Sequence, residues 1–76
     1  MNKNELCKTI GKNIRKYRME YNKKNQMTQE MLAEAVGVST SLISKLESEK
    51  VVQGISITTI YKISIVLNKN INDFLE

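Results

Sequence analysis

The sequence contains no histidine and one cysteine, Cys7. An intramolecular disulfide is therefore impossible, and a zinc site of the usual cysteine and histidine ligands is excluded. Cys7 itself has two interpretations, a small apolar filler or a redox-sensing thiol beside Lys8. The chain also lacks a Gly-rich phosphate loop and a nucleophile paired with a base. We expect no metal, no cofactor and no enzymatic activity.

Proline is absent, and only three glycines occur. The strongest helix breaker is thus missing, and Gly37 and Gly54 fall between segments with helical patterns. No apolar run reaches the 18 residues that a membrane-spanning helix needs, and the N-terminus lacks a secretory core. We expect a cytoplasmic protein without membrane contact. A length of 76 residues, 41% of them hydrophobic, predicts one small helical domain over residues 1–76.

The net charge of +4 is unevenly distributed along the chain. Residues 1–26 hold eight Lys or Arg against two Glu, which gives +6, whereas residues 27–76 hold four Lys against six acids, which gives −2. A basic block can be a solvated face or a surface that attracts phosphate. The second interpretation would be the better one if the chain also carried a motif that contacts nucleic acid.

The spacing of apolar residues predicts five helices. The first is an apolar stripe with intervals of three and four residues, formed by Leu6, Ile10, Ile14, Tyr17 and Tyr21. The expected ranges are about 5–21, 28–36, 39–48, 56–67 and 71–75. In the fourth range, Ile57, Ile60, Ile63 and Leu67 share one side, although its many β-branched residues would also suit a strand.

Capping residues support these boundaries. Thr28, Ser39, Ser56 and Asn70 stand where N-caps are needed. Gly37 and Asn68 stand where a left-handed residue ends a helix. Met27 and Met31 are expected to fill the core.

The segment from Gln29 to Ser48, QEMLAEAVGVSTSLISKLES, contains two short helical patterns that meet at Gly37. Ala33 stands where the two helices must approach closely. Apolar contacts come from Leu32, Val36, Val38, Ile43 and Leu46. The second helix leaves short polar groups outside, which suits a surface pressed against a partner. This is the helix-turn-helix arrangement, whose second helix reads the DNA major groove.

With MTQEMLAEAVGVSTSLISKLE and ISITTIYKISIVLNKNINDFL, the chain resembles the Cro and phage-repressor family, also called the xenobiotic-response-element type, over about residues 10–75. The resemblance implies an all-α, compact five-helix bundle of the lambda-repressor-like kind. Its members commonly bind double-stranded DNA as homodimeric transcription regulators.

The resemblance also implies roles for individual residues. Base contacts would come from Thr40, Ser41 and Lys45, and backbone contacts from Gln29, Thr28, Ser39, Ser44, Ser48 and Lys50. Arg18 and Glu47 would form a structural ion pair. The alternatives are plainer: Gln29 as a first-turn residue, Thr40 and Ser41 as helix-start residues, and Lys45 as a solvated lysine. Leu42 could contact a thymine methyl group or pack inward.

Two features depart from the family pattern. Ser48-Glu49-Lys50 follows Glu47 where Asn-Gly and a basic residue are frequent, and DNA would repel Glu49 if it pointed that way. The loop before Thr28 is about four residues longer than usual, and its Lys23 and Lys24 either extend the phosphate contact or are solvated.

For self-association we expect the C-terminal helices to supply the contact, through Ile55, Ile71, Phe74 and Leu75. Ile57 is a further candidate for this surface. For Phe74, burial in the monomer core is the preferred alternative. The competing function is a protein-interaction module, such as a partner-binding antitoxin, that keeps the fold without reading DNA.

Overall fold

The computed structural model describes residues 1–21 and 27–76. Five helices follow one another in the described residues: α1 (Lys3–Glu20), α2 (Gln29–Val36), α3 (Thr40–Glu47), α4 (Ile57–Val66) and α5 (Ile71–Leu75). These residues contain no strand. The all-α fold with five helices is therefore confirmed, and the β-branched segment around Ile60 is helical.

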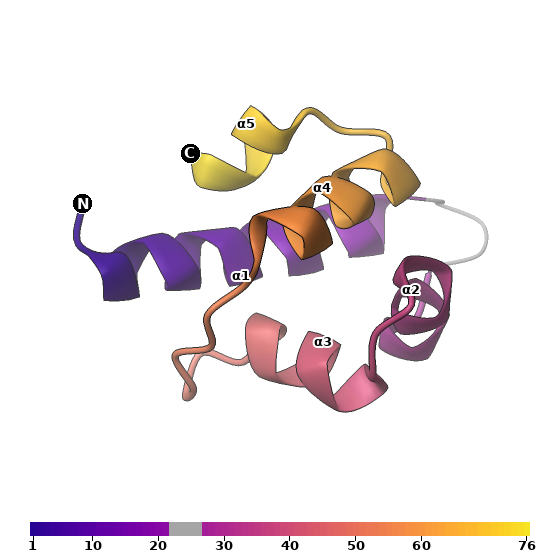
Figure 1. Ribbon diagram of the computed structural model, residues 1–76, viewed down its shortest axis with the longest axis horizontal. Coiled ribbons are helices and arrows are strands. Elements are labelled where there is room, and N and C mark those ends of the chain that lie inside the picture. The colour runs from indigo at the N-terminus through magenta and orange to yellow at the C-terminus, as the bar shows by residue number, and fades with distance from the viewer. Residues whose placement is uncertain (22–26) are drawn as a thin grey trace.

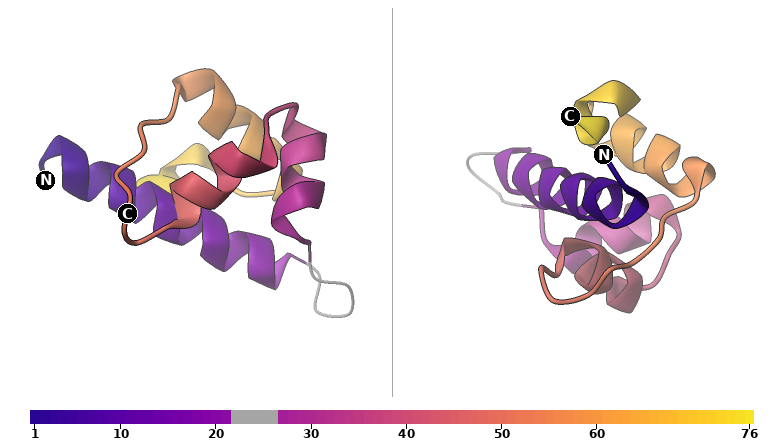
Figure 2. Two further views of the ribbon diagram at one scale, coloured as in Figure 1. Left: turned by 90° about the horizontal axis from the view of Figure 1, so that it is seen from below. Right: turned by 90° about the vertical axis from the view of Figure 1, so that its left-hand side faces the viewer.

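Helix α1 crosses the whole molecule, with α2 and α3 on one side of it and α5 on the other (Figure 1). In the view from below, α3 lies in front of α1 and α4 (Figure 2). One core joins all five helices, and its buried side chains are Ile10, Ile14, Leu32, Ala33, Val36, Ile43, Leu46, Ile60, Ile63, Leu67 and Phe74.

Short polar side chains set the start of most helices. Thr28, Ser39 and Ser56 each accept a hydrogen bond from the backbone N–H three residues on, at 3.0, 3.0 and 3.1 Å. Asn2 does the same for α1, which therefore begins two residues before the expected position. At α5, the backbone N–H of Asn70 donates to Asp73 at 3.0 Å. These bonds satisfy amides that a helix leaves without an internal partner.

Gly37 and Asn68 have positive φ angles of 84° and 56°. Gly37 adopts this left-handed conformation at the end of α2, where the N–H groups of Gly37 and Val38 both donate to the carbonyl of Ala33. Ala33 is buried beside this turn, and its small side chain lets α3 cross close to α2.

Side-chain bonds attach α5 to α1. The amide of Asn13 donates to the carbonyls of Phe74 and Glu76 at 2.9 and 3.1 Å. Tyr17 donates to the carbonyl of Asp73 at 3.3 Å, and its ring meets that of Phe74 edge-on with 5.2 Å between centroids. A helix of only five residues is thus held by contacts to α1 as well as by its own bonds.

Four apolar residues do not lie where the pattern predicts. Leu6 and Tyr21, at the ends of the α1 stripe, are exposed because the rest of the chain packs only against the middle of this long helix. Met31 is exposed on α2, whereas Met27 packs against the core. Ile57 is exposed in the first turn of α4, while Ile60 and Ile63 are buried.

Candidate nucleic-acid interface

Helix α3 has one buried and one exposed side. Ile43, Leu46 and Glu47 are buried, and Leu42 is half-buried against the core, so it packs inward. The exposed side chains are those of Thr40, Ser41, Ser44 and Lys45. Residues three or four positions apart are neighbours on a helix surface, and this spacing links Thr40 to Ser44, Ser44 to Ser41, and Ser41 to Lys45. The fold therefore brings these polar groups onto one surface.

Ser39, the N-cap of α3, directly precedes this surface, and Thr28 caps α2, whose first residue Gln29 contacts the end of α3. The hydroxyl oxygens of Thr28 and Ser39 already accept the N–H groups of Met31 and Leu42. A hydroxyl that accepts one hydrogen bond can still donate its own proton. Thr28 and Ser39 are both exposed, so each hydroxyl can still donate a hydrogen bond to a phosphate oxygen. Both lie at the N-terminus of a helix, where the positive end of the helix dipole favours an anion.

Glu47 is the polar centre of the domain. Its side chain is 2% exposed and receives two bonds from Arg18, Nε to Oε2 and Nη2 to Oε1, both of 2.7 Å. Arg18 also donates through Nη1 to the carbonyl of Met27 at 2.8 Å. The two parallel bonds match the planar guanidinium to the carboxylate. The ion pair thus joins α1 to α3 and to the residues before α2.

Gln29 also binds Glu47, which sequence reasoning missed. Its Nε2 donates to Oε1 of Glu47 at 3.1 Å. An amide nitrogen carries two protons, so one donor remains for a phosphate. The carboxylate orients this half-buried side chain at the start of α2. The two residues are 18 positions apart, and no local pattern predicts their contact.

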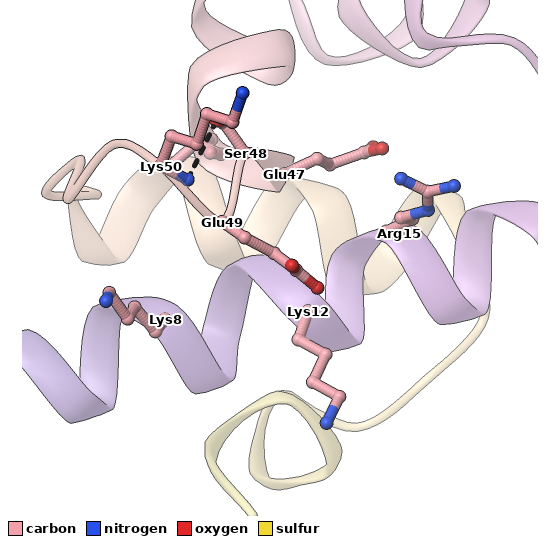
Figure 3. Close-up of a pocket in the computed structure, with 8 residues that line it drawn as sticks. Lys8, Lys12, Arg15, Glu47, Ser48, Glu49 and Lys50 are labelled. Carbon is pink, nitrogen blue, oxygen red and sulfur yellow. Dashed lines mark hydrogen bonds between the residues drawn. The ribbon is translucent and has the colours of Figure 1, made fainter.

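An open groove of about 780 Å³ lies between α1 and the end of α3. Three cations of α1 line it, namely Lys8, Lys12 and Arg15, and Lys50 contributes from the other side (Figure 3). Their charged ends point in different directions in this view, so they do not converge on one point. The groove is a basic surface and not a preformed pocket for a single anion.

The segment after α3 is ordered by its own bonds. The backbone N–H of Lys50 donates to the hydroxyl of Ser48 at 3.2 Å. Figure 3 shows Glu49 directed toward α1, whereas the ammonium group of Lys50 points away from that helix. Glu49 thus faces the basic helix. Lys23 and Lys24, for which phosphate contacts were considered, lie outside the described residues.

Among the candidates for self-association, Phe74 takes its preferred alternative and lies in the monomer core. Phe74 is completely buried because its ring fills the space between Tyr17 and the core, so it cannot contact a second copy. Ile55 and Ile71 are half-buried and pack against the same core. Leu75, with 38% of its surface exposed, and the further candidate Ile57, with 71%, remain on the outside.

The described residues contain no group of three side chains that could hold a metal ion. None of their helices is long and apolar enough to cross a membrane.

Comparisons with known proteins agree with this geometry. The sequence model of a family described as helix-turn-helix matches residues 14–74. The match includes α2, α3 and the turn between them. A comparison with curated proteins finds no match.

Proposed function

Because the chain belongs to the helix-turn-helix family, a non-enzymatic family of DNA-binding domains, we propose that it is a dimeric transcriptional repressor that reads an inverted repeat through α3. The observation that carries this proposal is the exposed polar surface of α3, whose other side is anchored in the core. The family accounts for DNA binding, and the reading surface, the dimer and the repressor role are our proposal.

Affinity and selectivity come from different groups in this mechanism. Gln29, Thr28 and Ser39 donate to phosphates, helped by Ser44, Ser48 and Lys50 at the flanks, and these contacts set the position of the domain without reading sequence. The buried ion pair of Arg18 with Glu47 supports this arrangement, since Glu47 orients Gln29. The basic surface of α1 adds attraction that weakens with salt.

Selectivity comes from Thr40, Ser41 and Lys45. The hydroxyl groups can donate or accept, so they discriminate between bases less sharply than a bidentate side chain. Lys45 can donate to O6 or N7 of guanine, a contact that contributes roughly 1–3 kcal/mol of discrimination. Two copies related by a two-fold axis would present α3 to successive major grooves about 34 Å apart. Repression then follows from occupation of a promoter.

Selection of random duplex DNA by the purified chain tests the proposal. We expect an inverted repeat whose half-sites lie about one helical turn apart. The variant Thr40→Ala, Ser41→Ala, Lys45→Ala should lose this enrichment. A matched control, Lys69→Ala with Asn72→Ala, changes exposed residues near α5 and should keep it. If the folded wild-type chain enriches no sequence at low salt, specific DNA reading by this chain is refuted.

A further inference from the structure

Helix α4 carries a stripe of large apolar side chains on its outside. Ile57, Tyr61 and Ile65 are 71%, 58% and 62% exposed, although their neighbours Ile60 and Ile63 are buried. The three recur every four residues, so they lie along one side of the helix. No other helix in the described part of the chain exposes three large apolar residues in such a row. We call these three residues the α4 stripe.

The α4 stripe reads the same in both directions. An isoleucine stands four residues before Tyr61, and another stands four residues after it. A two-fold axis through Tyr61 that pairs two α4 helices antiparallel would place Ile57 against Ile65 of the second copy and Tyr61 against its own equivalent. A closed two-fold contact requires this kind of self-complementary surface.

The position of α4 in the fold also suits such a pair. Helix α4 packs against α2 and α5, and Figure 1 shows it at the level of α1, with α3 below both. When two helices pair antiparallel, the two-fold axis is perpendicular to the plane that contains them. Both α3 helices then lie on the same side of the pair, as a dimer that reads one face of DNA requires.

We propose that the α4 stripe is the surface through which two copies of this chain associate. The inference rests on the proposed function, because it names the dimer contact of the same DNA reader. In this proposal the α4 stripe forms the contact between the copies, and Phe74, which is enclosed in the core, takes no part in it.

The size of the stripe determines how strong this association is. Three such side chains expose on the order of 300–400 Å² per copy, which is a patch large enough to mark an interaction site. Two copies would bury less than the roughly 1,200–2,000 Å² of a stable interface. The dimer should therefore be weak in free solution and should form fully on an inverted repeat, where both copies are held next to each other.

Cysteine crosslinking tests the register directly. In a Cys7→Ser background no other thiol is present, so Tyr61→Cys should give a covalent dimer with a short bismaleimide at high protein concentration. A mixture of the Ile57→Cys and Ile65→Cys chains should give a heterodimer, while each alone should give little product. Lys62→Cys, exposed on the same helix beside the stripe, is the matched control.

DNA binding provides the second test. Ile65→Lys should reduce affinity for the inverted repeat at least about tenfold, because cooperative binding is lost, yet leave single half-site affinity unchanged within about twofold. Thermal unfolding monitored by circular dichroism verifies that each variant is folded. Crosslinking at Tyr61 without DNA enrichment would refute the DNA-reading function but support this interface. Absence of crosslinking at Tyr61, both free and on DNA, would overturn the interface, and the stripe would then serve a different partner.

Discussion

Gly11 lies where α1 crosses the end of α3, and it is buried there. A methyl group at this position would overlap the backbone carbonyl oxygen of Leu46. Backbone atoms cannot rotate away as a side chain can, so the two helices would have to separate. Gly11 thus permits the close crossing of α1 and α3.

We predict that Gly11→Ala destabilises the fold by about 2 kcal/mol, the cost of overpacking a tight contact. In a helix with free space at this position, the same change would stabilise the fold by up to about 1 kcal/mol. A loss of stability would therefore show that the added methyl group meets the backbone of α3. Thermal unfolding should show a melting temperature lower by roughly 10 °C.

Gly54→Ala is the control for this prediction. Nothing lies within 4 Å of a methyl group there, and its φ angle is not positive. Its stability should stay within about 0.5 kcal/mol of the wild type. Equal melting temperatures for the Gly11 and Gly54 variants would show that α1 and α3 do not meet so closely.

At the residue scale, neighbouring residues in the sequence were sufficient to predict the helix caps. Thr28, Ser39 and Ser56 each bond within three residues of themselves, and the left-handed Gly37 and Asn68 depend on their own backbone conformation. The role of Gly11 depends on a carbonyl 35 positions away, and no local pattern contains that information.

At the scale of elements, one carboxylate links three helices. Glu47 at the end of α3 accepts hydrogen bonds from Arg18 of α1 and from Gln29 of α2. Because the carboxylate is almost fully buried, its two bonds with Arg18 are screened little by water. The mutual orientation of these helices depends on this group.

We predict that Glu47→Gln destabilises the domain by about 2–4 kcal/mol. The neutral amide leaves the guanidinium without a counter-charge and turns one acceptor into a donor that faces Arg18. The partial exposure of Arg18, 12%, keeps the loss below that of a completely buried pair. Chemical denaturation measures it through the midpoint at unchanged slope.

Glu49→Gln, two residues further on and exposed, is the matched variant and should change stability by less than about 0.5 kcal/mol. A similar midpoint for both variants would mean that the ion pair contributes no net stability.

The sequence predicted the number and the approximate bounds of the helices, because apolar spacing and caps are properties of single elements. It left Ile57 open between the apolar side of the fourth helix and the self-association surface, because helical spacing shows which residues share a side and not how far the core reaches along it. The first turn of α4 extends past that core, so Ile57 is exposed. For Phe74 the sequence left self-association and burial open, with burial preferred, and packing against Tyr17 encloses the ring.

At the scale of the whole molecule, the positive charge gathers on α1. Lys8, Lys12 and Arg15 line the groove beside the end of α3. The slope of log affinity against log salt concentration is proportional to the number of phosphates that the protein contacts, so a measured slope gives the number of these contacts.

We predict that Lys8→Gln with Lys12→Gln makes the slope of log affinity against log salt shallower by about 1–2, with little effect on which sequence is preferred. Lys16→Gln is the control, because the Lys16 ammonium lies over the Tyr17 ring, 5.5 Å from its centroid, and does not line the groove. A titration in which all three chains share one slope would show that this groove does not face DNA.

The C-terminus leaves the fold at α5, on the side of α1 opposite α3 (Figures 1 and 2). The carbonyl of Glu76 is held there by the amide of Asn13 at 3.1 Å. A fluorophore, a fused reporter or a link to a solid support attached after Glu76 would therefore start from an anchored point and extend away from α3. The chain can be immobilised by this end with α3 left accessible.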